Sequence, residues 1–289
     1  MGFIAQVGIA YEVIRWEEKS LTEAAKELGL EPKLIHLHST YLLVGLNGKK
    51  SLDPALSVVL QRAISHAIAL NSTLALESMG LRVVNNSLST AIAMNKLWTI
   101  KTLSNIGISV PNTAISFDFD SCLKATNVLG YPVVIKPIDG SWGRLIAMAR
   151  DEEELRAVIE HRSYIPNPIM KVNMLQEFVK KPNRDIRVFV IGEEVPAAIY
   201  RVSNHWITNT ARGGIAVPAK VDSTLEELAL KVARSINAEI VGVDVFEDPE
   251  RGYIVNEVNA IPEFKNTVKA TGCPIHMKIM EYIKSLVKK

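Results

Sequence analysis

Two carboxylate residues and one amide residue that could bind a ligand together lie near the end of the sequence. They belong to the segment EIVGVDVFEDPERGYIVNEVN, residues 239–259. Two β-rich runs flank Pro-Glu-Arg-Gly, a compact turn, so the segment predicts a β-hairpin. A four-residue loop after Asp248 places Asp244 directly opposite Glu257. Because strand side chains alternate with a period of two, Asn259 points to the same face as Glu257.

Two carboxylates on facing strands repel each other, so a cation between them is expected. Oxygen ligands without sulfur or imidazole suit a hard cation, and Mg²⁺ is the usual one beside phosphates. The missing side chain of Gly242, opposite Asn259, favours a ligand on this face. The hairpin therefore predicts a magnesium site at Asp244, Glu257 and Asn259. The alternative is a solvated strand face.

A second feature is the glycine-flanked loop Gly140–Ser141–Trp142–Gly143, which follows the apolar run VVIKP. No Gly-Lys-Ser/Thr follows and no long helix begins there, so it is not a Walker loop. A glycine loop between two antiparallel strands can fold over phosphates and offer backbone N–H donors. Lys136, at the end of the preceding strand, is placed to reach a phosphate. The alternative is an ordinary hairpin with a surface lysine.

Composition excludes several classes of protein. The chain has 289 residues and a net charge of +2, so no overall basic field points to nucleic acid. Cys122 and Cys273 lie far apart, which argues against a thiolate zinc site and a disulfide framework. No apolar run reaches membrane-spanning length and no secretory leader is evident, so we expect a cytoplasmic protein without a membrane partner.

Apolar periodicity predicts an α/β and α+β protein of three lobes. Strands and helices alternate in a small parallel lobe over residues 1–90. A central α+β lobe with the glycine loop is expected over 91–171, and a third lobe with antiparallel strands over 172–289. The main predicted elements are helices at 19–30, 65–81, 89–107, 224–237 and 275–288, and strands at 33–39, 56–62 and 82–86.

The order of these motifs resembles the ATP-grasp superfamily of carboxylate–amine ligases over nearly the whole chain. The sequence runs from Lys96 through Lys136 and the glycine loop to LQEFV, residues 175–179, and then to the hairpin. The resemblance implies ATP held between two α+β lobes, with an α/β lobe before them. The alternative of another class is an ATP-binding regulator without activity, which the complete set of lysines and metal ligands disfavours.

The resemblance also implies a role for each matching residue. Lys96 and Lys136 contact phosphates, and Gly140, Ser141, Trp142 and Gly143 form a lid. Residues Gln176, Glu177, Phe178 and Val179 form a hinge that binds adenine, largely through backbone groups, and Asp185 lies near the ribose. Two Mg²⁺ ions are bound by Asp244, Glu257 and Asn259, with Glu257 bridging them.

Several segments are similar to the RimK-like branch of this superfamily, and within it to the LysX group. These are GSWGRL, RDIRVFV, HWITNTARGG and NEVN…EFKN. The LysX group joins α-aminoadipate to the side-chain carboxylate of the carboxy-terminal glutamate of LysW, a small acidic carrier protein. Cationic and amide side chains in the loop suit carboxylates and a tetrahedral intermediate. We expect Arg201, Asn209 and Arg212 to act in catalysis, and Arg187 and His205 to contact substrate.

The pair Asn266–Thr267, after EFK, separates two related groups. In the resemblance, Asn-Thr accompanies α-aminoadipate, whereas Gly-Phe accompanies glutamate in the ArgX group. Since these substrates differ by one methylene, worth about 1–3 kcal/mol in a pocket, dual specificity stays open. A RimK-type ligase that adds glutamate to another protein is the other alternative.

The predicted reaction has two steps. The carrier carboxylate attacks the γ-phosphorus of ATP, and the amine then displaces phosphate from the acyl phosphate. The residues single out no general base for the amine. Members of the group are usually homotetramers, which suggests a homo-oligomer. Candidates for docking the carrier are the basic residues Arg15, Arg62, Lys171, Lys180, Lys181, Arg184 and Lys269.

Overall fold

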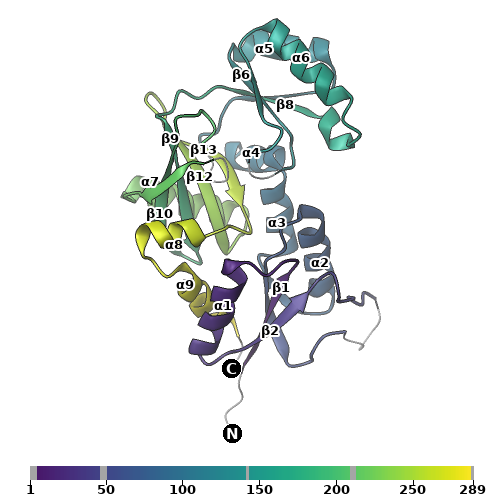
Figure 1. The fold of residues 1–289 in the computed structure, drawn as a ribbon, viewed down its shortest axis with the longest axis vertical. Helices are drawn as coiled ribbons and strands as arrows, with labels where there is room; N and C mark the ends of the chain where they lie inside the picture. The colour runs from purple at the N-terminus through teal and green to yellow at the C-terminus, as the bar shows by residue number, and fades with distance from the viewer. Residues whose placement is uncertain (1–4, 46–50, 141–142, 209–212, 288–289) are drawn as a thin grey trace.

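A computed structural model describes residues 5–45, 51–140, 143–208 and 213–287. Three lobes form an elongated molecule, with the central lobe of the sequence at one end and the N-terminal lobe at the other (Figure 1). The C-terminal lobe lies between them. Within the described residues, no helix combines the length and apolar character needed to cross a membrane.

The N-terminal lobe is built on a parallel sheet of order β2-β1-β3-β4. Its central strand β1 was not predicted, whereas the three expected strands are present. Helix α1 begins three residues before the predicted start at residue 19. Arg15 and Glu18 form a capping box there, in which the Arg15 backbone N–H donates to Glu18 (2.9 Å). The elements are β1 Gln6–Tyr11, α1 Trp16–Glu27, β2 Glu31–His36, β3 Leu56–Gln61, α2 His66–Ser78 and β4 Arg82–Val84.

The single helix expected over 89–107 is wrong, because the structure has two helices there. These are α3 (Ser87–Met94) and α4 (Lys96–Ser104). Asn95 between them has an extended backbone, and its side chain accepts from the backbone N–H of Trp98 (3.0 Å). Because an N-cap residue has a non-helical backbone, the helix before Asn95 cannot continue through it. Lys96 is therefore the first residue of a helix.

The central lobe has an antiparallel sheet of order β5-β8-β6-β7. Helices α5 and α6 cover one face, with Cys122 and Leu155 buried against Ile135. Strand β8 belongs to this sheet, so the chain leaves the lobe after Glu177 and not at the predicted boundary of 171. The elements are β5 Thr113–Ser116, α5 Phe119–Leu129, β6 Val133–Lys136, β7 Ala147–Ala149, α6 Glu152–Ser163, the 3₁₀ turn η1 Pro168–Lys171 and β8 Asn173–Glu177.

The C-terminal lobe is an antiparallel sheet of order β11-β10-β9-β12-β13 with helices on both faces. Alternate residues of β9 serve the two faces: Val188 packs in the cluster with α7, whereas Phe189 packs in the cluster with α9. The short helix α8 was not predicted. The elements are β9 Arg184–Ile191, β10 Glu194–Val202, β11 Ile215–Pro218, α7 Ser223–Ser235, β12 Ile240–Asp248, β13 Gly252–Asn259, α8 Lys265–Thr271 and α9 Ile275–Leu286.

The N-terminal and C-terminal lobes share one hydrophobic core, in which Val7 and Leu21 pack in the same cluster as Ile279. The amide of Asn85, just after β4, joins the same lobes. Its Nδ2 donates to the carbonyl oxygens of Ile240 (2.6 Å) and Ala260 (2.7 Å), and its Oδ1 accepts from the backbone N–H of Glu239 (2.7 Å) and Ile240 (2.9 Å). These four bonds and the shared core fasten two of the lobes together.

Candidate active site

The β12–β13 hairpin places Asp244 opposite Glu257 and Gly242 opposite Asn259, as predicted. The route to this register differs from the prediction. Strand β13 pairs Gly252 with Asp248, so the loop is one residue shorter than expected. A register shift after Asp244 restores the predicted pairs, because Asn256 is an extra residue on β13. The bulge brings Asn256 close to Lys136, whose Nζ donates to its Oδ1 (2.9 Å).

Asp244 is the centre of a buried charge network, and its side chain is 2 % exposed. Arg187 donates two hydrogen bonds to it (2.7 and 2.8 Å), and Arg201 donates a third (2.9 Å). Burial alone raises the pKa of the Asp244 carboxyl, but the two guanidinium groups hold it below its usual value. An ionised carboxylate has about four lone-pair sites, so one acceptor site stays available for a metal ion.

Arg201 connects this network to a second buried carboxylate. It donates to both oxygens of Asp185 (2.6 and 2.8 Å), and the hydroxyl of Thr208 donates to Asp185 as well (2.5 Å). Burial lowers the pKa of Arg201, but Asp244 and Asp185 raise it above its ordinary value. The guanidinium is thus a fixed positive charge between two carboxylates.

Both predicted phosphate-binding lysines lie beside this hairpin. Lys96 forms an ion pair with Glu257 (3.1 Å) and donates to the carbonyl oxygen of Gly140 (2.5 Å). Burial lowers the pKa of Lys136 to about 8, and Lys96 adds to this lowering while Glu257 opposes it. A second cation close to a desolvated lysine favours an anionic ligand, because an anion would offset both charges.

The glycine loop joins β6 and β7, which pair antiparallel, as predicted. Gly140 has φ 148° and Gly143 has φ 64°, values that side-chain-bearing residues rarely adopt. The loop therefore needs glycine at both positions. Ser141 and Trp142, the predicted tip, lie outside the described residues.

A cavity beside the hinge, here called the hinge cavity, is largely apolar. The hinge residues Gln176–Val179 line it, together with Lys136, Ile146, Lys181, Asp185, Trp206, Phe246 and Asn256. Gln176 is buried, and its Nε2 donates to Thr113 (2.9 Å), while its Oε1 has no partner among the described residues. Glu177 instead accepts from Arg251 (2.6 Å) and Asn112. An apolar cavity with a few polar groups is typical of a small-molecule site.

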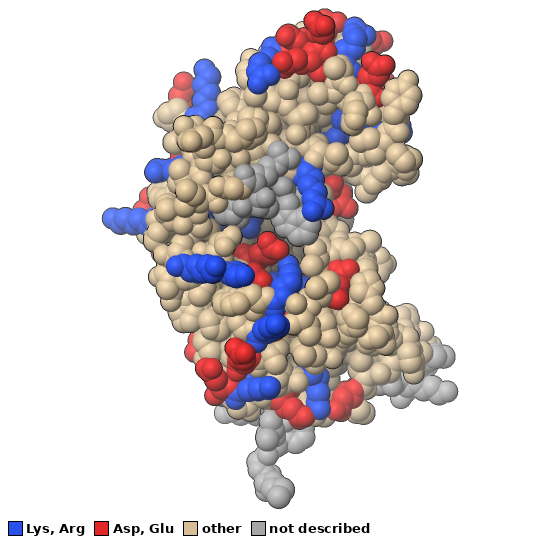
Figure 2. Space-filling view, viewed as in Figure 1, with Lys and Arg blue, Asp and Glu red and all other residues tan. Residues whose placement is uncertain are grey.

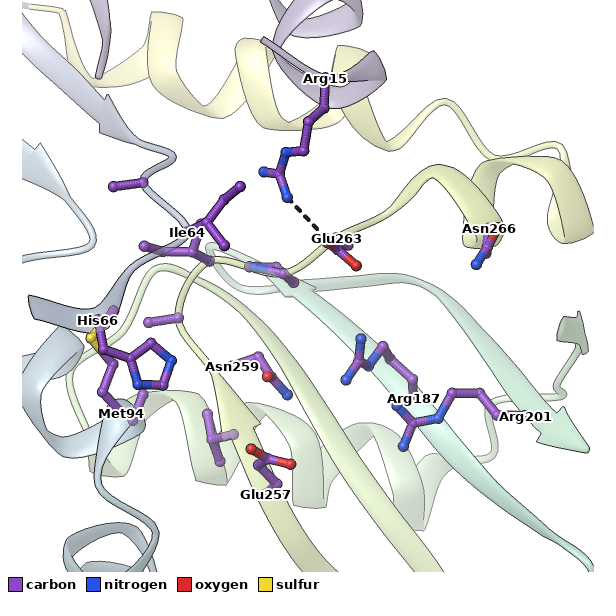
Figure 3. Close-up of a pocket in the computed structure, with 16 residues that line it drawn as sticks. Arg15, Ile64, His66, Met94, Arg187, Arg201, Glu257, Asn259, Glu263 and Asn266 are labelled. Atoms are coloured by element: carbon purple, nitrogen blue, oxygen red, sulfur yellow. Dashed lines mark hydrogen bonds and ion pairs between the residues drawn. The ribbon is translucent and has the colours of Figure 1, made fainter. Parts of the chain in front are cut away.

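A second, strongly charged hollow lies on the face shown in Figure 2, where Lys, Arg, Asp and Glu side chains gather. It consists of two adjoining cavities, here together called the arginine cavity, which share Arg15, Arg187, Arg201, Glu263 and Asn266. One part is also lined by His66, Met94, Glu257 and Asn259, and the other by Lys265 and Thr267 (Figure 3). Three arginines that face one cavity suit carboxylates.

The predicted pair Asn266–Thr267 lies in helix α8 at this cavity. Thr267 is 1 % exposed, and its hydroxyl oxygen has no hydrogen-bond partner among the described residues. A buried hydroxyl without a partner is costly, so a ligand that bonds to it gains a hydrogen bond in this position.

Comparisons with known proteins assign the family. Residues 93–283 match the RimK-like ATP-grasp domain, and residues 7–92 match the LysX preATP-grasp domain. The chain belongs to the RimK-like ATP-grasp family. This family consists of ATP-dependent ligases, and its members bind ATP and Mg²⁺. The predicted fold and enzyme class are therefore confirmed.

Individual relatives cover almost the whole chain. It is 44% identical to an α-aminoadipate–LysW ligase LysX of Sulfurisphaera tokodaii over 98% of this chain and 99% of the relative. It is 34% identical to a glutamate–LysW ligase ArgX of the same organism, over 96% and 98%. A RimK domain ATP-grasp protein of Sphaerobacter thermophilus has a similar fold, with a TM-score of 0.77, 21% identity and coverage of 97% and 100%.

Not every predicted site residue of this RimK-like protein lines a cavity described above. His205 is exposed, its ring lies beside Trp206, and its Nδ1 accepts from the backbone N–H of Ile207 (3.0 Å). Asn209 and Arg212 lie outside the described residues. Arg62 and Lys181 are not surface cations for carrier docking: Arg62 is buried against Glu18, and Lys181 lines the hinge cavity.

Sequence reasoning missed functional candidates that other lobes supply. It treated Arg15 only as a docking residue, although Arg15 lines both parts of the arginine cavity. It did not single out His66 or Asn256. The first comes from the N-terminal lobe, and the second is exposed to the site by a bulge. Neither a lobe arrangement nor a bulge leaves a periodic signal in one sequence.

Proposed function

We propose that the protein joins the amino group of α-aminoadipate to a carboxylate of a LysW carrier protein, with ATP converted to ADP and phosphate, in lysine biosynthesis. The observation that carries the proposal is the position of the arginine cavity. It begins at Glu257 and Asn259, beside the two lysines, and extends to Asn266 and Thr267. A phosphate site and a carboxylate site thus adjoin.

The relatives support the choice of amino acid. Three ligases named for α-aminoadipate and LysW are 41–44% identical to this chain, whereas two named for glutamate and LysW are 34% identical. The pair Asn266–Thr267 agrees with the first group. The free hydroxyl of Thr267 is placed to bond to a polar group of the bound amino acid.

We assign different residues of the chain to the different parts of ATP. We assign the triphosphate to Lys96 and Lys136, because both are cations beside Glu257. We assign adenine to the hinge cavity and place Asp185 near the ribose, where it also holds Arg201. Gly140 and Gly143, with Ser141 and Trp142 between them, form a lid that excludes water from the acyl phosphate.

The oxygen donors of the hairpin fit a hard cation. Glu257 and Asn259 line the cavity, and Asp244 keeps an acceptor site. Carboxylate and amide oxygens are ligands that suit Mg²⁺. We propose that these three residues hold two Mg²⁺ ions, which when bound offset the charge of the triphosphate.

Arg187 and Arg201 are the cations next to the expected acyl carbon. Both are held by Asp244, so their guanidinium groups are oriented before substrate binds. A preorganised positive charge stabilises the oxyanion of a tetrahedral intermediate. We assign Asn209 and Arg212 to the same step, His205 to substrate contact and Arg15 to a substrate carboxylate.

The test is an intact-mass assay with the protein, ATP, Mg²⁺ and a LysW carrier. α-Aminoadipate and glutamate are offered separately, and the carrier is weighed. We expect a mass gain of one aminoadipate residue with the first amino acid and little gain with the second. A gain with glutamate alone would contradict the assigned specificity, and a gain with both would show a bifunctional ligase. No gain with either would overturn the proposed function.

A further inference from the structure

His66 is a titratable residue in the arginine cavity that the proposed mechanism does not yet use. It begins helix α2, which Ser65 caps, and its ring lines the cavity together with Glu257 and Asn259. In Figure 3 the imidazole points from the N-terminal lobe towards the side on which Asn259 and Glu257 lie. His66 therefore faces the same cavity as Glu257 and Asn259, which lie between it and Arg187 in this view.

A hydrogen bond to Asp139 fixes the orientation and the tautomer of the His66 imidazole. The Asp139 carboxylate, on the loop after β6, is hydrogen-bonded to Nδ1 of His66. An ionised carboxylate only accepts, so Nδ1 carries the proton and the basic lone pair of the ring is on Nε2. The hydrogen bond from His66 keeps the pKa of Asp139 below its usual value, so the carboxylate remains ionised. A histidine oriented by a carboxylate is a common arrangement for a general base.

The amine needs such a base. An amino acid arrives as an ammonium ion, which has no lone pair with which to attack the acyl carbon. The other charged groups that line this part of the cavity are unsuitable: Arg15, Arg187 and Arg201 stay protonated, Glu263 is paired with Arg15, and Glu257 is paired with Lys96. Imidazole is the side chain that normally changes its charge near neutral pH.

We propose that His66 is the general base that deprotonates the attacking amine, and that Asp139 is its positioning residue. Nε2 of His66 takes one proton from the ammonium group. The neutral nitrogen then forms the C–N bond, and the bond between the acyl carbon and the phosphate oxygen breaks. The second nitrogen proton leaves with phosphate as hydrogen phosphate, and His66 releases its proton to solvent.

The proposal predicts that amide formation falls at acid pH, because protonated His66 accepts no proton. The charged groups around it come from several elements. Asp139 and Lys96 lie on the side of the central lobe, and Glu12 accepts from the backbone N–H of Ser65 (2.6 Å). The remaining charges facing the cavity are Arg15, Arg187, Arg201, Glu257 and Glu263. Helix α3 contributes Met94, which carries no charge.

Because this role rests on the proposed function, the experiment separates the two by using two amines. Wild type and His66→Gln are given ATP, Mg²⁺ and the LysW carrier, with either α-aminoadipate or hydroxylamine. Hydroxylamine is largely unprotonated at neutral pH and captures an acyl phosphate without a base. We expect His66→Gln to lose about 100-fold or more in aminoadipate transfer at pH 7. Hydroxamate formation should stay near the wild-type rate.

Two further variants sharpen the result. Asp139→Asn should also lose aminoadipate transfer but keep hydroxamate formation, because the amide can donate to Nδ1 and stabilise the wrong tautomer. His161→Gln, on the exposed face of α6, is the matched control and should behave like wild type. The deficit of His66→Gln should shrink as the pH rises towards the pKa of the substrate amine.

Each outcome decides one point. Equal loss with both amines would show that His66 only supports the lid or the fold, and would overturn the proposal. Unchanged aminoadipate transfer in His66→Gln would overturn it too. If wild type forms neither hydroxamate nor the aminoadipate product, the proposed function fails and the role of His66 fails with it.

Discussion

The hinge cavity and the arginine cavity lie on the same face of the C-terminal sheet, where Phe246 lines the first and Arg187 the second, and they are built in different ways. Apolar side chains, including Phe178 and Phe246, form much of the wall of the first, alongside the charged residues Lys136, Glu177, Lys181 and Asp185. The second collects arginines from the N-terminal and C-terminal lobes and fixes them with buried carboxylates. The first suits a ligand that all ATP-dependent enzymes share. The second suits particular carboxylates.

This difference in construction predicts a difference in sensitivity to mutation. In the arginine cavity one side chain serves several partners, so a single change leaves other buried charges unpaired. In the hinge cavity the side chain of Gln176 has a single partner, Thr113, so its replacement leaves no buried charge unpaired. Four variants test this contrast.

The largest effect is expected for Arg201→Gln. The change removes the cation between Asp185 and Asp244 and leaves the buried Asp185 without its guanidinium partner, while Asp244 keeps Arg187; the expected cost is about 3–5 kcal/mol of the free energy of unfolding. Urea denaturation measures this cost, and ligase activity should be lost as well. Arg234→Gln is the matched control: its partner Glu193 is also exposed, so stability should hardly change. Similar losses in both variants would mean that the network is not what makes this region sensitive.

The next effect concerns Lys136, at the border of the two cavities. Since burial lowers its pKa to about 8, it is mostly protonated below that pH and loses its charge above it. ATP affinity should be flat at lower pH and then fall by up to about tenfold per pH unit above 8. Calorimetric titration at several pH values measures the slope. Lys136→Met should bind ATP more weakly and lack this slope; a slope that persists in the variant would assign it to another group.

A smaller effect is expected for Thr267→Val, which keeps the shape and removes the hydroxyl. Because that hydroxyl is buried without a partner, its loss should leave stability unchanged or raise it. The KM for α-aminoadipate should rise about 5–10-fold, as for one lost hydrogen bond. Thr271→Val, in the same helix, is the control, because its hydroxyl donates to the carbonyl of Thr267 (2.7 Å). It should lower stability with little change in KM; the reverse pattern would remove Thr267 from the substrate site.

The smallest effect is expected in the hinge cavity. Gln176→Leu removes a buried acceptor without a partner in a residue that lines the cavity, and we expect about a fivefold loss of ATP affinity, as for one hydrogen bond. Binding of ATP and GTP should be compared, since only adenine offers an amino group at this edge. Thr113→Val, which removes the partner of Nε2, is a milder control. An unchanged ratio of ATP to GTP affinity would show that the backbone alone reads the base.

The sequence predicted most of the fold because its strands and helices are strongly periodic. The prediction failed where a single side chain determines where a helix begins or ends. Asn95 ends one helix and caps the next, and α8 begins at Lys265, where the N-cap residue Phe264 provides no side-chain hydrogen bond. The hairpin is instructive, because the loop is one residue shorter than predicted and the bulge at Asn256 compensates for it. The predicted pair Asp244–Glu257 was thus reached through two errors that cancel.

The candidate site was predictable only in part. Residues that follow one another in a motif, such as those of the hinge, were located from sequence. The pairing of Asp185 with Arg201 was not, because it depends on the register of β9 with β10. The position of His66 was not predictable either, since it depends on how the N-terminal lobe packs on the others. Tertiary contacts of this kind carry no local signal.

The amide of Asn85 has a mechanical consequence. Four hydrogen bonds and a shared core join the first and last lobes into one body, whereas the central lobe is joined to it by fewer contacts, such as the Lys96 N–H to Ile138 backbone bond and the Arg251–Glu177 pair. We therefore expect closure on a nucleotide to be a movement of the central lobe relative to this body. The arginine cavity, lined mainly by the first and last lobes, should then keep its shape while the hinge cavity opens and closes. Cutting the chain after residue 92 would remove half of the buried residues of the cluster that the two lobes share, so we expect residues 93–283 alone to be less stable than the whole chain.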